Sequence, residues 1–118
     1  MEFICKDDVV FIQKNQAFID DEASALDFIV GVKYETGLGK AIIPKENFSE
    51  EFFDLQTKIA GAILEKFVMY QFCLAIVGDF SVYDSSALKA FIRESNRGRH
   101  LYFVDTETEA FEKLNAVK

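Results

Sequence analysis

Several residues able to do chemistry carry hydroxyl or carboxylate groups and stand beside predicted strands. Ser49 precedes a long amphipathic segment, and Asp79, Ser81 and Asp84 follow the apolar run 72–78. Carboxylates at such positions can hold a divalent cation, and a serine at the start of a helix can be a phosphorylation switch. The same residue types also cap helices, so each can equally be structural. We therefore predict these residues as ligand or switch candidates, with capping as the alternative.

A second group of candidates is basic and surrounds the start of a late strand. Its members are Arg93, Arg97, Arg99 and His100, with Lys40 and Lys66 expected at the same edge of the sheet. Such a patch can dock an acidic partner or a phosphate-bearing ligand. Cations are also favoured at helix C-termini, which is the structural alternative.

Other chemistries find little support in the sequence. His100 is the single histidine, and no serine or cysteine lies beside it, so neither a catalytic triad nor an HExxH motif is indicated. Gly37 and Gly39 lie between a helix and a strand, the reverse of the order in nucleotide-binding loops. Cys5 and Cys73 lack metal-site spacing, and we predict buried free thiols, with a disulfide or a reactive thiol as the alternative. We predict no metal and no cofactor.

The composition limits the class of protein. The 118 residues include 13 basic and 20 acidic ones, and the net charge of −7 disfavours nucleic acid and anionic lipid as partners. The longest apolar run, 72–78, is far shorter than the roughly 18 residues of a membrane-spanning helix. The N-terminus has no secretory pattern, so we expect one cytoplasmic domain over 1–118 without a membrane partner. The 13 phenylalanines leave a homodimer or a protein partner open.

Apolar spacing predicts the elements that position the candidates. Phe52, Leu55 and Ile59 begin a stripe that predicts one amphipathic helix over 49–70, with Ser49 as its N-cap. The strand that follows, over 72–78, shows no polar alternation, which is typical of a strand covered on both faces. The candidates therefore flank a central strand and its helix.

The remaining predicted elements alternate between strands and helices. They are strands over 2–6 and 9–13 around a turn at Asp7 and Asp8, a helix over 22–35 capped by Asp20 or Asp21, a strand over 40–44, a helix over 85–96 capped by Asp84, a strand over 101–104, and a last helix with a capping box at Thr106 and Glu109. The order ββαβαβαβα predicts an α/β fold, with a mostly parallel five-stranded sheet, an N-terminal antiparallel hairpin and four helices. Ligands of such sheets usually bind at the carboxyl ends of the strands, which here would gather Glu46, Asn47, Ser49, Asp79, Ser81, Tyr83, Asp84 and Asp105.

Several stretches of the chain carry a resemblance to a known family. They include Tyr-Glu-Thr-Gly at 34–37, Ser-Glu-Glu-Phe-Phe-Asp-Leu at 49–55, Leu-Ala-Ile-Val-Gly-Asp-Phe-Ser at 74–81 and Glu-Ser-Asn-Arg-Gly-Arg-His at 94–100. These stretches resemble a bacterial family described only as domain of unknown function 4180. The resemblance covers nearly the whole chain and implies no known activity.

The order of elements is also similar to that of the sulfate-transporter and anti-sigma-antagonist domain, the SpoIIAA-like fold. In that family a serine or threonine at the start of the helix after the third strand is phosphorylated, which switches protein binding. Ser49 occupies the corresponding place, so the resemblance implies a switch there. This chain departs from the family pattern, because Glu50 and Glu51 replace a loop of the Asp-Ser-Ser-Gly type.

We expect a non-catalytic regulatory module that binds a protein or a small ligand. No set of nucleophile, base and orienting group is visible in the sequence. Two alternatives stay open. One is a metal-assisted hydrolase or transferase that uses the acidic carboxyl edge, and the other is a phospho-regulated switch at Ser49.

Overall fold

The computed structural model describes residues 4–12 and 18–117. Its elements are β1 (Ile4–Lys6), β2 (Val9–Phe11), α1 (Glu22–Thr36), β3 (Lys40–Pro44), the 3-10 turn η1 (Lys45–Asn47), α2 (Glu50–Phe53), the 3-10 turn η2 (Leu55–Thr57), α3 (Ile59–Met69), β4 (Cys73–Val77), α4 (Ser86–Arg97), β5 (Leu101–Val104) and α5 (Glu107–Asn115). The strands form one five-stranded sheet in the order β1-β2-β3-β4-β5. The pair β1–β2 is antiparallel and the other pairs are parallel, so the predicted fold class is confirmed. The predicted strand ends at residues 2, 3 and 13 lie outside the described residues.

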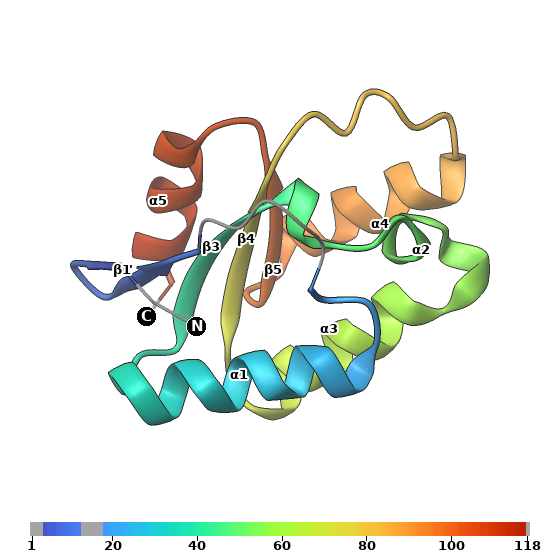
Figure 1. The fold of residues 1–118 in the computed structure, drawn as a ribbon. Helices are drawn as coiled ribbons and strands as arrows, with labels where there is room; N and C mark the ends of the chain where they lie inside the picture. The colour runs from blue at the N-terminus through green and yellow to red at the C-terminus, as the bar shows by residue number, and fades with distance from the viewer. Residues whose placement is uncertain (1–3, 13–17, 118) are drawn as a thin grey trace.

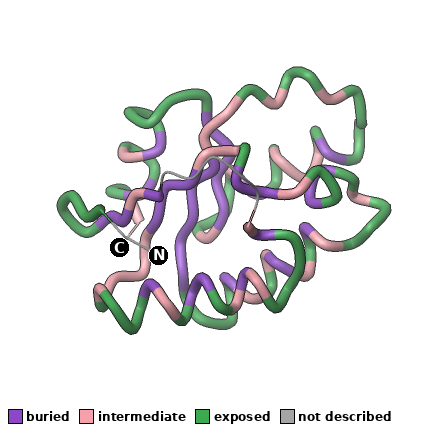
Figure 2. Tube along the Cα trace, in the orientation of Figure 1, coloured by how far each residue is buried: buried purple, intermediate pink, exposed green. Residues whose placement is uncertain are grey.

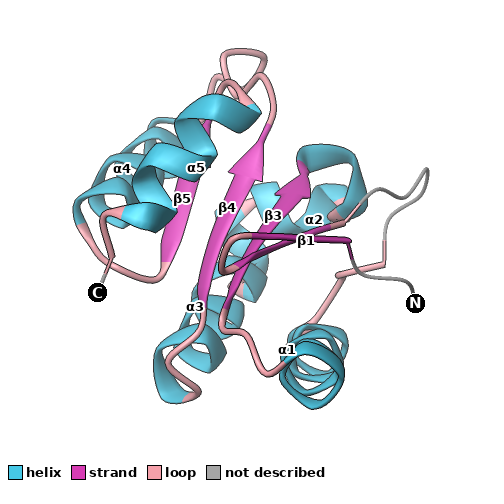
Figure 3. Ribbon diagram, turned by 90° about the vertical axis from the view of Figure 1, so that its left-hand side faces the viewer, coloured by secondary structure: helices cyan, strands magenta, loops and turns pink. Residues whose placement is uncertain are grey.

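The helices cover the two faces of the sheet unequally (Figure 1 and Figure 3). Helices α1, α2, α3 and α4 pack on the face that contains Ile43, Ile76 and Phe103, whereas α5 packs on the face that contains Ile42 and Ala75. Each strand after β2 is added beside the preceding one, and right-handed crossovers between strands added in one direction bring their helices to the same face. Only the helix after the last strand remains to cover the other face.

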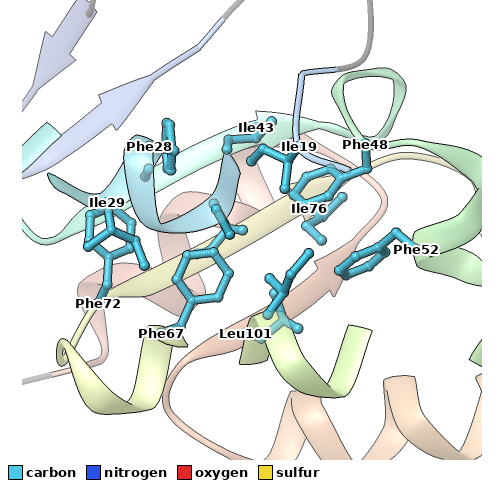
Figure 4. Close-up of a cluster of buried hydrophobic side chains, with 14 of the residues drawn as sticks. Ile19, Phe28, Ile29, Ile43, Phe48, Phe52, Phe67, Phe72, Ile76 and Leu101 are labelled. Atoms are coloured by element: carbon cyan, nitrogen blue, oxygen red, sulfur yellow. The ribbon is translucent and has the colours of Figure 1, made fainter. Parts of the chain in front are cut away.

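The core on the four-helix face is rich in phenylalanine (Figure 4). Phe52, Phe67 and Phe72 are fully buried, and Phe67 lies 5.8 Å from Phe72 between ring centroids. The central strand β4 is buried along almost its whole length, as Figure 2 shows, which confirms the prediction that both of its faces are covered. None of the helices in the described part of the chain is long and apolar enough to cross a membrane.

The predicted continuous helix over 49–70 is wrong, because the backbone breaks between α2 and α3. The hydroxyl of Thr57 donates to the carbonyls of Glu51 and Asp54, at 2.8 and 2.7 Å, and Lys58 adopts a left-handed conformation with φ 65°. Side chains such as Asp and Thr compete with the helical hydrogen bonds in this way. The apolar residues still face the core on both sides of the break, so their spacing imitates one helix.

Local capping chemistry is largely as predicted. The Asp21 side chain accepts from the backbone N–H of Ser24 in a capping box, and Gly37 ends α1 with φ 72°. The predicted cap at Asp84 is wrong, because Ser85 accepts from the backbone N–H of Leu88 and α4 begins one residue later. Thr106 caps α5 by accepting from the backbone N–H of Glu109, but the predicted capping box is incomplete, because Glu109 Oε1 accepts from the backbone N–H of Asp105 and not from that of Thr106.

The two cysteines lie in different environments. Both are free, and Cys73 is buried as predicted, but Cys5 is exposed. The prediction of a buried Cys5 is wrong because β1 is an edge strand whose three residues are all exposed.

The other edge of the sheet is closed by a side chain of α4. Asn96 accepts from the backbone N–H of Phe103 at 2.8 Å and donates to the carbonyl of the same residue at 3.3 Å. The amide group thus satisfies the outward-facing backbone groups in the middle of β5, in place of a neighbouring strand.

Candidate functional site

Asp79 and Ser81, predicted as ligand candidates, lie together in a turn after β4. The Oδ1 atom of Asp79 accepts from the backbone N–H of Ser81 at 2.9 Å and from its hydroxyl at 2.5 Å. These hydrogen bonds, the hydroxyl contact first, lower the pKa of the Asp79 carboxyl. The Asp79 carboxylate is therefore engaged in the hydrogen bonds of a local turn. Asp84 is exposed in the loop that follows.

Ser49, the other candidate at this edge, is placed differently from a capping serine. Its backbone N–H donates to the carbonyl of Ile19 at 3.1 Å, and its side chain makes no capping bond to α2. The Oγ atom is buried and has no hydrogen-bond partner within the described part of the chain. In this conformation the hydroxyl is not accessible to a kinase.

A cation–aromatic cluster that the sequence did not reveal lies beside these residues. The Lys45 ammonium lies 4.7 Å from the centroid of the Tyr83 ring, which stacks on Phe53 at 5.2 Å. The Tyr83 hydroxyl donates to Glu50 Oε2 at 3.2 Å. Because Pro44 pairs with Val77 in the sheet, the next residues, Lys45 and Gly78, also face each other. This register of β3 with β4, which the sequence alone does not give, is what brings Lys45 beside Gly78.

The Tyr83 phenol makes a testable contribution to the pH dependence of stability. Burial, and then the negative charge of Glu50, raise its pKa to about 12. An unfolded chain loses this proton near the ordinary tyrosine pKa of about 10, so the stabilising contribution is complete below that pH and is lost as the pH rises through the folded-state pKa. We expect Glu50→Gln to lower the pKa of Tyr83, as measured by tyrosinate absorbance. Glu46→Gln serves as the control, and equal titrations of the two variants would contradict the assignment.

The acidic carboxyl edge does not assemble a metal site in the part of the chain that the structure describes. No group of three or more His, Cys, Asp or Glu side chains able to hold a metal ion occurs there. A pocket of about 300 Å³ does open at this edge, on the α5 face of the sheet, and it is lined by Ile12, Ile42, Pro44, Glu46, Val77, Gly78 and Glu107. Of the residues predicted for the carboxyl edge, Glu46 contributes to this pocket.

The predicted basic patch is divided among different partners. Arg97 lies 3.7 Å from Glu94, and Lys66 lies 3.8 Å from Glu22. Lys40 donates through Nζ to the carbonyls of Leu114 and Val117 at the end of α5, at 2.7 Å each. These groups act mainly within the fold.

Arg99 and His100 are brought together at pockets on the amino edge of the sheet. One pocket, of about 410 Å³, is lined by Asn96, Gly98, Arg99, Tyr102, Lys113, Ala116 and Val117. A second, of about 460 Å³, is lined by Val68, Gln71, Cys73, Arg99, His100 and Val117. We call them the Arg99 pockets, since Arg99 lines both. The sequence indicated Arg99 and His100 but missed Lys113 and Tyr102, which come from α5 and β5.

The reactive groups of the Arg99 pockets are held as neutral hydrogen-bond donors. Burial raises the pKa of the Cys73 thiol, against the opposing effect of Lys40 and Arg99, and Sγ donates to the Arg99 carbonyl at 3.0 Å. Burial likewise raises the pKa of Tyr102, whose hydroxyl donates to the Gly98 carbonyl at 2.9 Å. A protonated, hydrogen-bonded thiol is a poor nucleophile.

The ring of His100 is oriented by the backbone just before β4. Its Nδ1 atom lies 3.1 Å from the carbonyl oxygen of Phe72. Since a carbonyl can only accept, Nδ1 carries the proton of this hydrogen bond, which orients the ring where it lines the second pocket.

Fold and pockets together define an α/β domain with ligand-sized pockets at the amino edge of a mostly parallel sheet. The chain belongs to the family described as Domain of unknown function (DUF4180), whose model matches residues 5–114. Comparisons with curated proteins and with solved structures give no match.

Proposed function

We propose that this domain is a non-catalytic module that binds a small anionic ligand in the Arg99 pockets. The observation that carries the proposal is the charge of their lining. Among the described residues that line these pockets, Arg99 and Lys113 are the charged side chains, and none of the others is aspartate or glutamate. In a chain of net charge −7, this local reversal of sign favours an anion over a cation.

The helix ends at this edge carry partial negative charge, which other lysines compensate. Lys40 donates to carbonyls at the end of α5, and Lys33 donates to the carbonyl of Tyr70 at the end of α3. The charge of Lys113 is therefore not needed to cap α5. A carboxylate or phosphate can pair with the planar guanidinium of Arg99 through two parallel hydrogen bonds.

The enzyme and switch alternatives have less support. The thiol and phenol in the pockets are protonated and engaged, and the metal-assisted alternative has no cluster of metal-binding side chains among the described residues. The buried hydroxyl of Ser49 does not favour phosphorylation. We also propose the broader form, a regulatory use of ligand binding, which the resemblance of the element order to SpoIIAA-like domains would imply.

Titration with inorganic phosphate and with acetate, followed by backbone amide shifts, tests the proposed function. We expect shifts at Gly98, Arg99 and His100, and affinity at least about threefold weaker in Arg99→Gln and in Lys113→Gln. Arg93→Gln is the matched control, because Arg93 is exposed on α4 and does not line these pockets. Equal affinities in the Arg93 and Arg99 variants, or shifts confined to the carboxyl edge, would refute the proposal.

A further inference from the structure

An apolar groove continues from the Arg99 pockets between α3 and α4. It has a volume of about 230 Å³, and its lining includes Leu64, Val68, Phe91, Arg99, His100 and Leu101. The residues of α3 and α4 that line the groove lie between the middle and the C-terminal end of each helix. Arg99 and His100 follow shortly after the end of α4. The groove is therefore apolar along the helices and basic at the end where they terminate.

The groove and the second Arg99 pocket share Val68, Arg99 and His100. Because these residues line both spaces, the groove and the pocket adjoin one another. Glu94 also lines the groove, but its carboxylate is directed toward Arg97 at 3.7 Å. Where the groove and the second pocket adjoin, the charged side chain that lines both is that of Arg99.

Part of the apolar lining is exposed to water. Val68 is 49% exposed, and Leu64 and Phe91 are only partly buried. Covering such surface with an apolar part of a ligand is favourable, because apolar area is removed from water. An apolar tail attached to an anionic head would satisfy both the groove and the basic end.

We infer that the ligand of the Arg99 pockets is an amphipathic acid, with an anionic head at Arg99 and His100 and a short hydrocarbon tail in the groove between α3 and α4. This inference rests on the proposed function and specifies its ligand class. The small volume of the groove favours a short tail over a long acyl chain. A carboxylate and a phosphate head share the required chemistry.

A chain-length series tests the inference on the full chain. Acetate, butanoate, hexanoate and octanoate are titrated by calorimetry and by amide shifts, with octyl phosphate to compare heads and octanol to remove the charge. We expect affinity to rise about two- to fourfold for each added methylene until the groove is filled. Octanol should bind more weakly than octanoate, because it lacks the charged head. The longer acids should also shift the backbone amide signals of Val68 and Leu101.

Variants separate the tail contacts from the head contacts. Val68→Ser should flatten the dependence of affinity on chain length, whereas Arg99→Gln should weaken all acids by a similar factor and leave that dependence intact. Val30→Ser is the matched control, since Val30 is 52% exposed on α1 and does not line the groove.

The outcomes distinguish the two proposals. If acetate binds at Arg99 and longer acids bind no more tightly, the amphipathic ligand is refuted and the anion site stands. Octanol binding as tightly as octanoate also refutes the amphipathic acid. If no acid or phosphate binds, the proposed function fails and this inference fails with it.

Discussion

Replacing Phe52 with alanine is expected to lower the free energy of unfolding by about 3–5 kcal/mol, the usual cost of removing a buried phenylalanine. The side chain is fully buried, and its ring centroid lies 4.8 Å from that of Phe48 and 5.0 Å from that of Phe53. Phe52 also anchors α2, a helix too short to persist without tertiary contacts. The free energy of unfolding of a domain is about 5–15 kcal/mol, so this loss would be a large share of the total stability.

Urea denaturation measures this effect, and Phe111→Ala is the control. Phe111 is partly buried on the α5 face, where its ring lies 4.8 Å from Phe11. We expect a smaller loss there, because less apolar surface is exposed by the truncation. Equal losses in the two variants would show that Phe52 is not the anchor described above. Hydrogen exchange at the α2 amides should also accelerate in Phe52→Ala.

Substituting Gly78 with alanine is expected to cost about 1–3 kcal/mol, as overpacking of a well-packed position does. A Cβ atom at this position would lie 2.6 Å from Cβ of Lys45 and 3.0 Å from its Cδ. The nearer atom is next to the backbone of Lys45, so it cannot move away by a simple rotamer change. Relief of the clash should displace the Lys45 ammonium from the Tyr83 ring.

Gly61→Ala is the matched control for this substitution. A Cβ atom at Gly61, within α3, would meet nothing within 4 Å. Alanine in a helix interior is favoured over glycine, so we expect a gain of about 0.5–1 kcal/mol. Thermal unfolding of both variants gives the comparison. A Gly78 variant as stable as the parent chain would mean that Lys45 does not pack over the glycine.

Elements set by local chemistry could be predicted from the sequence. The capping box at Asp21 and the left-handed stop at Gly37 depend on residues within a few positions of each other. The break between α2 and α3 also has a local signal, in Asp54 and Thr57, but the apolar stripe outweighed it. Periodicity reports which side chains face the core, and it does not require the backbone between them to be one helix.

The sites were harder to predict, because they depend on how distant segments meet. The basic residues before β5 suggested a site near Arg99 and His100. The contribution of Lys113 required knowing that α5 alone covers the second face of the sheet. Likewise, the contact of Lys45 with Gly78 follows from the register of β3 with β4, which a single sequence does not fix. The carboxylates at the opposite edge belong to residue types that commonly cap helices. In the structure, the Asp79 carboxylate accepts hydrogen bonds within a local turn.

The amide of Asn96 takes the place of a neighbouring strand at Phe103. The β5 edge is therefore less able than the β1 edge to accept an added strand. Among the described strands, β1 then offers the more open edge, and two copies joined there would each turn outward a β5 edge that is already bonded at Phe103. Edge-to-edge growth would stop at a pair, because a filament requires two open edges on every unit.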